Sequence, residues 1–208
     1  MKKLFGVLVA LLIMNTAYSQ QAGKFRYQMD LGVAMPKDGG IGAIVNLEPQ
    51  ILVMNNLALG MRMGVAGLAK DIVYHDIQDD YDGEIGANIS VLATANYYFN
   101  FGKGNVAPYV GGGFGYYGLS NLDIEESDYD EDDFENLEAN FAWAPMLRAG
   151  VELNKFRIGV EYNFVPKSNL QDVRGDVVGR ATNEYFAFTL GFFVGGGRWG
   201  RNFSAAAR

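Results

Sequence analysis

Few residues of this chain are suited to chemistry, and they do not form a recognisable catalytic set. There is one histidine, His75, beside Asp76, and there is no cysteine. Hydrolysis by a nucleophile needs a base within reach of a hydroxyl or thiol, and acid–base hydrolysis needs paired carboxylates around a water. No serine lies near His75 in the sequence, since Ser90 is predicted to point inward and Ser120 and Ser127 fall in another loop. We therefore predict that the protein is not an enzyme, with catalysis at His75 as the alternative.

A second candidate is a strongly acidic segment, residues 118–140, which holds ten acids and no base. Three of its aspartates alternate as calcium ligands often do, but the position that an EF-hand reserves for glycine is occupied by Asp133, and the twelfth position is not glutamate. The segment is therefore predicted to be a solvated loop, with weak cation binding as the alternative. The residues of that alternative are Asp128, Asp130, Asp132 and Asp133. We predict no cofactor and no firm metal site.

The net charge of the chain and its distribution indicate whether a nucleic-acid partner is expected. The formal net charge is −7, from 17 basic and 24 acidic residues, and the ten acids of the acidic segment account for more than all of it. The rest of the chain is close to charge balance and has no basic stripe. A nucleic-acid partner is therefore not expected.

The elements that position these residues are eight stretches with an apolar residue at every second position. In the last of them Phe186, Phe188 and Leu190 share one face, while the residues between them share the other. A strand alternates its side chains with period two, and the apolar rows contain no charge, whereas the opposite rows do. This pattern predicts an inside-out barrel whose apolar face meets lipid. The rows span residues 27–35, 43–53, 57–65, 87–99, 106–116, 141–153, 156–164 and 186–194.

The connections between these stretches alternate in length. Tight turns follow the second, fourth and sixth stretches, and long polar segments (69–86, 118–140 and 167–183) follow the third, fifth and seventh. We predict an eight-stranded antiparallel up-and-down transmembrane β-barrel with both chain ends at the short-turn rim, on the periplasmic side. A soluble barrel that binds an apolar ligand would need a polar exterior. Pro49 and two other prolines inside the strands conflict with a closed ladder.

The turns also predict which charged residues meet inside the barrel. A two-residue turn at Asn154-Lys155 and a three-residue turn at 54–56 fix the register of two hairpins, and the charges at inward positions fall opposite each other. These pairs would fill and neutralise the interior, although a small pore remains the alternative. The predicted interior ion pairs are Glu152 with Arg157, Arg148 with Glu161, and Glu48 with Arg62.

The two ends of the chain have their own features. Lys2 and Lys3 precede an apolar run, and small residues follow at Ala17 and Ser19, as in a secretory signal peptide. We predict a signal peptide over 1–19, the barrel over 20–197 and a periplasmic tail over 198–208.

Several short runs resemble the small outer-membrane β-barrel proteins of the OmpA/OmpX-like kind. The resemblance implies an integral outer-membrane protein with a structural or surface-interaction role, such as adhesion or envelope integrity; a lipid-modifying enzyme is the alternative. Its implied partners are outer-membrane lipid, the barrel-insertion machinery and an extracellular partner at the long loops. Barrels of this kind usually end on an aromatic residue, whereas this chain continues past Phe193 into a tail. The runs are Asn46-Leu47-Glu48-Pro49, Leu57-Ala58-Leu59-Gly60, Pro108-Tyr109-Val110-Gly111, Glu161-Tyr162-Asn163-Phe164 and Leu190-Gly191-Phe192-Phe193.

Overall fold

A computed structural model gives the conformation of most of the chain. It describes residues 22–69, 73–74, 81–99, 105–124, 140–171 and 177–196. The predicted signal peptide (1–19) and C-terminal tail (198–208) lie outside the described residues, and their assignment stays a prediction. No helix among the described residues is long and apolar enough to cross a membrane.

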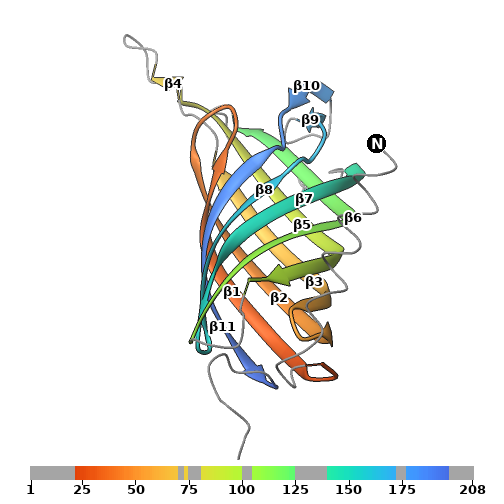
Figure 1. Ribbon diagram of the computed structural model, residues 1–208. Coiled ribbons are helices and arrows are strands. Elements are labelled where there is room, and N and C mark those ends of the chain that lie inside the picture. The colour runs from red at the N-terminus through yellow and green to blue at the C-terminus, as the bar shows by residue number, and fades with distance from the viewer. Residues whose placement is uncertain are drawn as a thin grey trace, which may run out of the picture.

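Eight strands close into one antiparallel barrel (Figure 1). Each strand pairs with the next along the chain, and the last pairs with the first, for example Leu31 with Leu190. The predicted fold class, an eight-stranded up-and-down barrel, is confirmed. The barrel strands are β1 (Phe25–Pro36), β2 (Ile41–Met54), β3 (Leu57–Ala69), β5 (Tyr81–Tyr98), β6 (Val106–Ile124), β7 (Asn140–Leu153), β8 (Phe156–Asn163) and β11 (Tyr185–Gly195).

Three short strands lie at the long-connection rim: β4 (Val73–Tyr74), β9 (Ser168–Gln171) and β10 (Val177–Ala181). The barrel strands β5 and β6 also reach further there than the sequence predicts, since their ladder continues to the pair Gly83 and Ile124. The predicted loops 69–86 and 118–140 are therefore partly strand, and Ser120 lies on β6 rather than in a loop. The cause is that backbone hydrogen bonds continue where the side chains turn polar, so the apolar period ends before the strand does.

The turns set the registers of two hairpins. Across the β7–β8 turn Leu153 faces Phe156, as predicted, and Asn154 has a φ of 60°, a left-handed conformation that asparagine tolerates well. Across the β2–β3 turn a register shift places Met54, rather than the predicted Val53, opposite Leu57. Beyond that bulge the pairing is the predicted one.

The prolines inside strands are accommodated without opening the barrel. The ladder between β2 and β3 passes from Leu47 to Gln50 without a pairing at Pro49, where an N–H is missing. The carbonyls of Pro108 and Pro145 each accept a backbone hydrogen bond, from Phe99 at 2.7 Å and from Phe164 at 3.1 Å. Each proline thus contributes an acceptor where it cannot contribute a donor.

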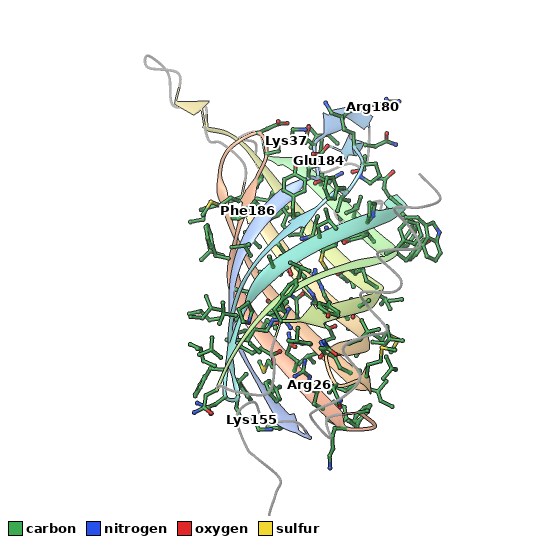
Figure 2. All side chains as sticks on the ribbon, viewed as in Figure 1. Arg26, Lys37, Lys155, Arg180, Glu184 and Phe186 are labelled. Carbon is green, nitrogen blue, oxygen red and sulfur yellow. The ribbon has the colours of Figure 1, made fainter. Side chains whose placement is uncertain are left out.

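The outside of the barrel is an apolar band bounded by aromatic side chains (Figure 2). Leu147 and Leu190 in this band are 59% and 65% exposed, and every barrel strand contributes exposed apolar residues. So large an exposed apolar surface is typical of contact with lipid. Aromatic pairs lie toward both ends of the band, as in the aromatic girdles of membrane barrels. At the short-turn rim the pairs are Phe25–Tyr27 and Tyr97–Phe99, and toward the other rim they are Tyr116–Phe141, Tyr162–Phe164 and Phe186–Phe188.

Candidate functional site

The half of the interior nearer the short-turn rim holds a network of buried charges. Equal numbers of cations and anions lie there, so the described interior is neutral as a whole. Neutrality matters because an unpartnered charge in a dry interior costs several kcal/mol. The buried charged residues are Arg26, Arg62, Arg148 and Arg157, with Asp30, Glu48, Glu152 and Glu161.

The first ion pair joins opposite walls of the barrel. Arg148 on β7 donates from Nη1 and Nη2 to the two oxygens of Glu48 on β2, each at 2.6 Å. Three strands lie between β2 and β7 in either direction around the closed sheet. Arg148 also donates from Nε to Asn96 at 2.8 Å, and the Thr94 hydroxyl donates to Glu48. The pair is therefore both bidentate and embedded in further hydrogen bonds, the arrangement in which a buried ion pair is held most firmly.

The second pair also crosses the lumen between opposite strands. Arg62 on β3 donates from Nη1 to both oxygens of Glu161 on β8, at 3.0 and 2.9 Å. Asn163 donates to Glu161 at 3.1 Å and accepts from the Tyr117 hydroxyl at 2.9 Å. This pair lies where the charged network meets the rest of the interior.

The third pair lies nearest the short-turn rim. Arg26 on β1 donates from Nη1 and Nη2 to Glu152 on β7, at 3.0 and 3.1 Å, and from Nε to Gln50 at 2.8 Å. It also donates to the Tyr98 hydroxyl, and its guanidinium lies over the Phe193 ring at 4.5 Å. Figure 2 labels Arg26 at this end of the barrel. Every donor group of this arginine is thus directed at a partner.

The structure corrects the predicted partners. The six residues named from the sequence all point inward, and Arg148 faces Glu161 in the β7–β8 ladder, as expected. Their ion pairs nevertheless form across the lumen, so the predicted pairing of Arg148 with Glu161 is wrong, and Glu48 pairs with Arg148 rather than with Arg62. The reason is the length of the arginine side chain. An inward-pointing arginine extends past the neighbouring strand to the barrel axis, and its guanidinium there meets side chains that come from the opposite wall.

The two remaining residues of the predicted pairs, Glu152 and Arg157, face each other in the β7–β8 ladder, as predicted, and each also contacts a strand beyond its neighbour. Glu152 forms an ion pair with Arg26. Arg26 is not among the predicted interior charges, although its neighbour Tyr27 faces outward and alternation therefore places Arg26 inside. Arg157 donates to the Tyr109 hydroxyl at 2.6 Å and to Gln28 at 2.5 Å. Period two was therefore a sufficient signal for the inward position of Arg26, though not for its partner.

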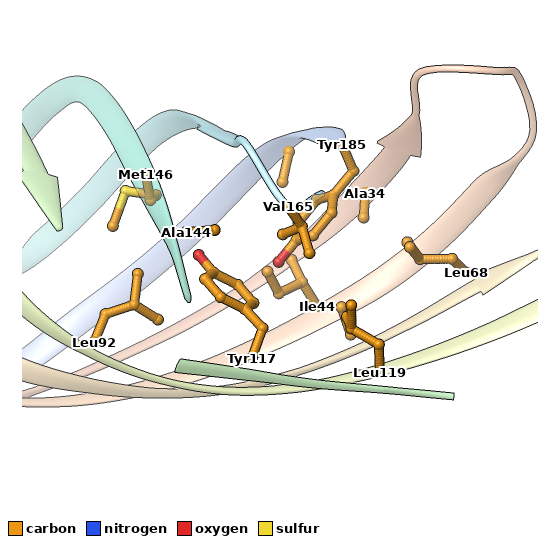
Figure 3. Close-up of a cluster of buried hydrophobic side chains, with 12 residues drawn as sticks. Ala34, Ile44, Leu68, Leu92, Tyr117, Leu119, Ala144, Met146, Val165 and Tyr185 are labelled. Atoms are coloured by element: carbon orange, nitrogen blue, oxygen red, sulfur yellow. The ribbon is translucent and has the colours of Figure 1, made fainter. Parts of the chain in front are cut away.

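The half of the interior nearer the long connections holds a large cluster of buried apolar side chains (Figure 3), although Asn88 and Asn121 are also buried there. This apolar plug corrects the prediction of a polar interior along the whole barrel. The sequence signal is that inward positions near the strand ends, such as Ile44 and Leu68, are apolar as well as the outward ones. The plug consists of Ala34, Ile44, Ala66, Leu68, Leu92, Tyr117, Leu119, Ala144, Met146, Val165, Tyr185 and Ala187.

The residues considered for catalysis and metal binding are not brought together among the described residues. Ser90 is buried inside the barrel, and its hydroxyl donates to the Gly64 carbonyl at 3.5 Å. Within the part of the chain that the structure describes, no three His, Cys, Asp or Glu side chains are grouped as metal ligands. The remaining candidates lie outside the described residues: His75, Asp128, Asp130, Asp132 and Asp133.

At the long-connection rim a polar clamp, formed by Lys37, Tyr162 and Glu184, joins the β1–β2 turn to the segment before β11. Glu184 accepts hydrogen bonds from the Tyr162 hydroxyl at 2.6 Å and from Lys37 Nζ at 3.0 Å. These hydrogen bonds hold the pKa of the Glu184 carboxyl below its ordinary value, and the same contact raises the pKa of Lys37. The Lys37 amide also donates to the Glu184 carbonyl at 3.0 Å, so the clamp has a backbone part that does not titrate.

The apolar exterior, the aromatic girdles and the charged interior together define an eight-stranded transmembrane β-barrel. The sequence matches no protein-family model and no curated protein. Similar solved structures include neisserial surface protein A, at 14% identity and a TM-score of 0.48, with 83% of this chain and 97% of that chain covered. The N-terminal β-barrel domain of Pseudomonas aeruginosa OprF is 13% identical with a TM-score of 0.45, covering 84% and 100%. The outer membrane enzyme PagL is 11% identical with a TM-score of 0.43, covering 80% and 98%.

Proposed function

We propose that the protein is an integral outer-membrane barrel with a closed interior, which serves a structural or surface-interaction role and performs no catalysis. The observation that carries this proposal is the filling of the lumen. Ion pairs join strands on opposite walls, Glu48 with Arg148 and Arg62 with Glu161, and the apolar plug occupies the other half. Such a barrel presents its loops and its outer face to partners rather than conducting solute.

The apolar plug argues against the alternative of a pore. An ion passing along the axis would have to lose its water among Leu92, Tyr117 and Met146, each of which is inaccessible to solvent. Moving an ion into so apolar a medium without a partner is costly. The charged network alone would leave this question open, because charges can also line a channel.

The orientation in the membrane follows from the two rims. The first and last described residues lie at the short-turn rim, where Gly23 donates to Leu52 and Gly196 donates to Phe25. In bacterial barrels short turns face the periplasm and long connections face outward. We therefore propose that the termini lie in the periplasm, that outer-membrane lipid and the insertion machinery contact the strands, and that an extracellular partner would bind the long connections.

Two measurements test this proposal. After cell lysis the protein should stay with the outer-membrane fraction through a high-salt wash, whereas release by osmotic shock as a soluble species would contradict the location. The purified protein in a planar bilayer should give no stable conductance steps. A steady open-channel current from the unmodified protein would contradict the closed interior and favour the pore.

A further inference from the structure

A small pocket opens at the long-connection rim, outside the charged network and the apolar plug. Its volume is about 220 Å³. Its walls come from the upper ends of β6 and β7 on one side and from the β9–β10 hairpin on the other; the hairpin stands at this end of the barrel in Figure 1, and Figure 2 labels Arg180 there. The lining residues are Leu119, Asn140, Phe141, Ala142, Lys167, Ser168, Asn169 and Arg180.

The charge of this pocket has one sign. Among the described residues that line the pocket, Lys167 and Arg180 are the only ionisable ones, and both are exposed. Neither forms an ion pair with another residue in the part of the chain that the structure describes. Two cations around one small concavity, with no carboxylate among its described lining residues, favour an anionic ligand.

Ser168 supplies a donor at the same place. Its side chain is nearly buried, and its oxygen accepts hydrogen bonds from Asn121 Nδ2 at 2.7 Å and from Asn183 Nδ2 at 2.9 Å. A hydroxyl has two acceptor sites and one hydrogen. Because both acceptor sites are used, the hydroxyl can only donate to a further partner, and an anion oxygen accepts such a bond.

An exposed aromatic cluster that begins at the lining residue Phe141 indicates the level of the pocket relative to the membrane. Phe141 stacks on Tyr116 with ring centroids 5.3 Å apart, and Trp143 stacks on Phe114 at 5.6 Å. Phe141 and Trp143 are 62% and 64% exposed on the outer face of the barrel. Exposed aromatic clusters of this kind lie at the boundary between acyl chains and headgroups. The cations of the pocket therefore lie directly above the acyl chains, at the level of lipid headgroups.

We propose that this pocket binds a phosphate group on the headgroup of an outer-leaflet lipid, with Lys167 and Arg180 balancing its charge and the Ser168 hydroxyl donating to one oxygen. Basic pockets at a membrane surface recognise lipid headgroups in this way. At about 220 Å³ the pocket is smaller than the roughly 300 to 1,000 Å³ of a site for a whole drug-sized ligand. It therefore takes the phosphate and leaves the acyl chains against the exposed aromatic face. The proposal rests on the proposed function, because it requires the long-connection rim to lie in the outer leaflet.

The test compares lipid retention by the purified barrel in nanodiscs, measured by native mass spectrometry. The probes are lipid A and lipid A from which both phosphates have been removed. For the unmodified protein lipid A should be retained and the dephosphorylated form should not. The double variant Lys167→Ala/Arg180→Ala should lose about thirtyfold in affinity, since each cation near an anionic lipid contributes about fivefold. Ser168→Ala should lose about tenfold, the usual effect of one hydrogen bond to a charged group.

The control variant Lys24→Ala/Lys155→Ala removes the same charge at the short-turn rim, far from the pocket, and should change the affinity by less than about twofold, as expected for charges distant from the ligand. Equal retention of the two lipids, or equal loss in both double variants, would overturn the proposed site. Competition by inorganic phosphate at the affinity of lipid A would overturn the lipid as its ligand. These results are distinct from failure of the proposed function, in which the protein would not remain in the membrane at all.

Discussion

The charged side chains of the interior form ion pairs that connect strands on opposite sides of the barrel. Arg148 joins β7 to β2, and Arg62 joins β3 to β8, so each pair links strands that share no backbone hydrogen bonds. The backbone ladder holds each strand only to its two neighbours. The side-chain pairs therefore add resistance to flattening of the barrel, which neighbouring-strand pairs would not.

The first prediction concerns the pair of Arg148 and Glu48. Arg148→Met or Glu48→Gln alone should destabilise the barrel by about 3 to 5 kcal/mol, because one buried charge loses its partner. The double variant should cost clearly less than the sum of the two. Equilibrium unfolding in urea from lipid vesicles measures all three variants.

The matched control for this prediction is the pair of Arg148 and Glu161. These residues face each other in the ladder between β7 and β8, but Glu161 forms its ion pair with Arg62. Their double-variant cycle should show a smaller coupling than the cycle of Arg148 with Glu48. A larger coupling would mean that the pair predicted from the turn is the one that forms.

At the scale of the residue, alternation in the sequence identifies which charges are inside but not which of them meet. The positions of Arg148 and Glu161 follow from one turn, because a ladder pairs residues in a fixed order. Their partners depend on how far each side chain reaches across a lumen whose width the sequence does not state. The contact between Arg26 and Glu152, 126 residues apart, is of this second kind.

The strands could be predicted from the sequence because the outer faces of all of them contact lipid. Lipid excludes charge from every outward position, which gives a period-two signal along each strand. The signal ends where the strand leaves the membrane, so the polar ends of β5 and β6 and the short strands β9 and β10 could not be found in this way. These extra strands build the rim pocket, which is why the pocket too was missed.

The second prediction concerns the outer face of β3. Met63→Arg, at the centre of β3, should destabilise the barrel by about 2 to 4 kcal/mol, because a charge in the middle of the lipid-facing band is poorly solvated. Asp38→Arg, in the exposed β1–β2 turn, introduces the same side chain in water and should have little effect. Thermal unfolding of both variants in the same vesicles makes the comparison. Equal losses would show that Met63 does not face lipid.

The third prediction concerns the clamp at the long-connection rim. Because hydrogen bonds from Tyr162 and Lys37 lower the pKa of Glu184, its stabilising effect is fully present above the ordinary carboxyl pKa, near pH 4 to 5. It is lost as the pH falls through the lower pKa of the folded state. Carbon-detected NMR titration should show Glu184 titrating below the other exposed glutamates, and Tyr162→Phe should raise its pKa. An unchanged pKa in that variant would contradict the hydrogen bond from Tyr162.

The whole molecule combines two interiors within one barrel. Toward the short-turn rim the charges neutralise each other, and toward the long-connection rim apolar side chains exclude water. Together with an apolar outer band this arrangement makes the barrel stable only when its outside is covered by lipid, because the exposed apolar surface would otherwise drive association. The sequence indicates this inside-out pattern through charge placement, while the division of the interior follows from packing.

The central claim, that β7 alternates between lipid and the closed lumen, is tested most directly by a spin-label scan. The chain has no cysteine, so single cysteines can be placed at each position from Phe141 to Leu153 without removing a native one. In lipid bilayers, oxygen collision rates should alternate with period two, high at Trp143 and Leu147 and low at Ala144 and Met146. Nickel chelate dissolved in water should reach neither set within the band. Equal oxygen accessibility at successive positions, or access of the water-soluble chelate to the inward ones, would contradict a closed transmembrane barrel.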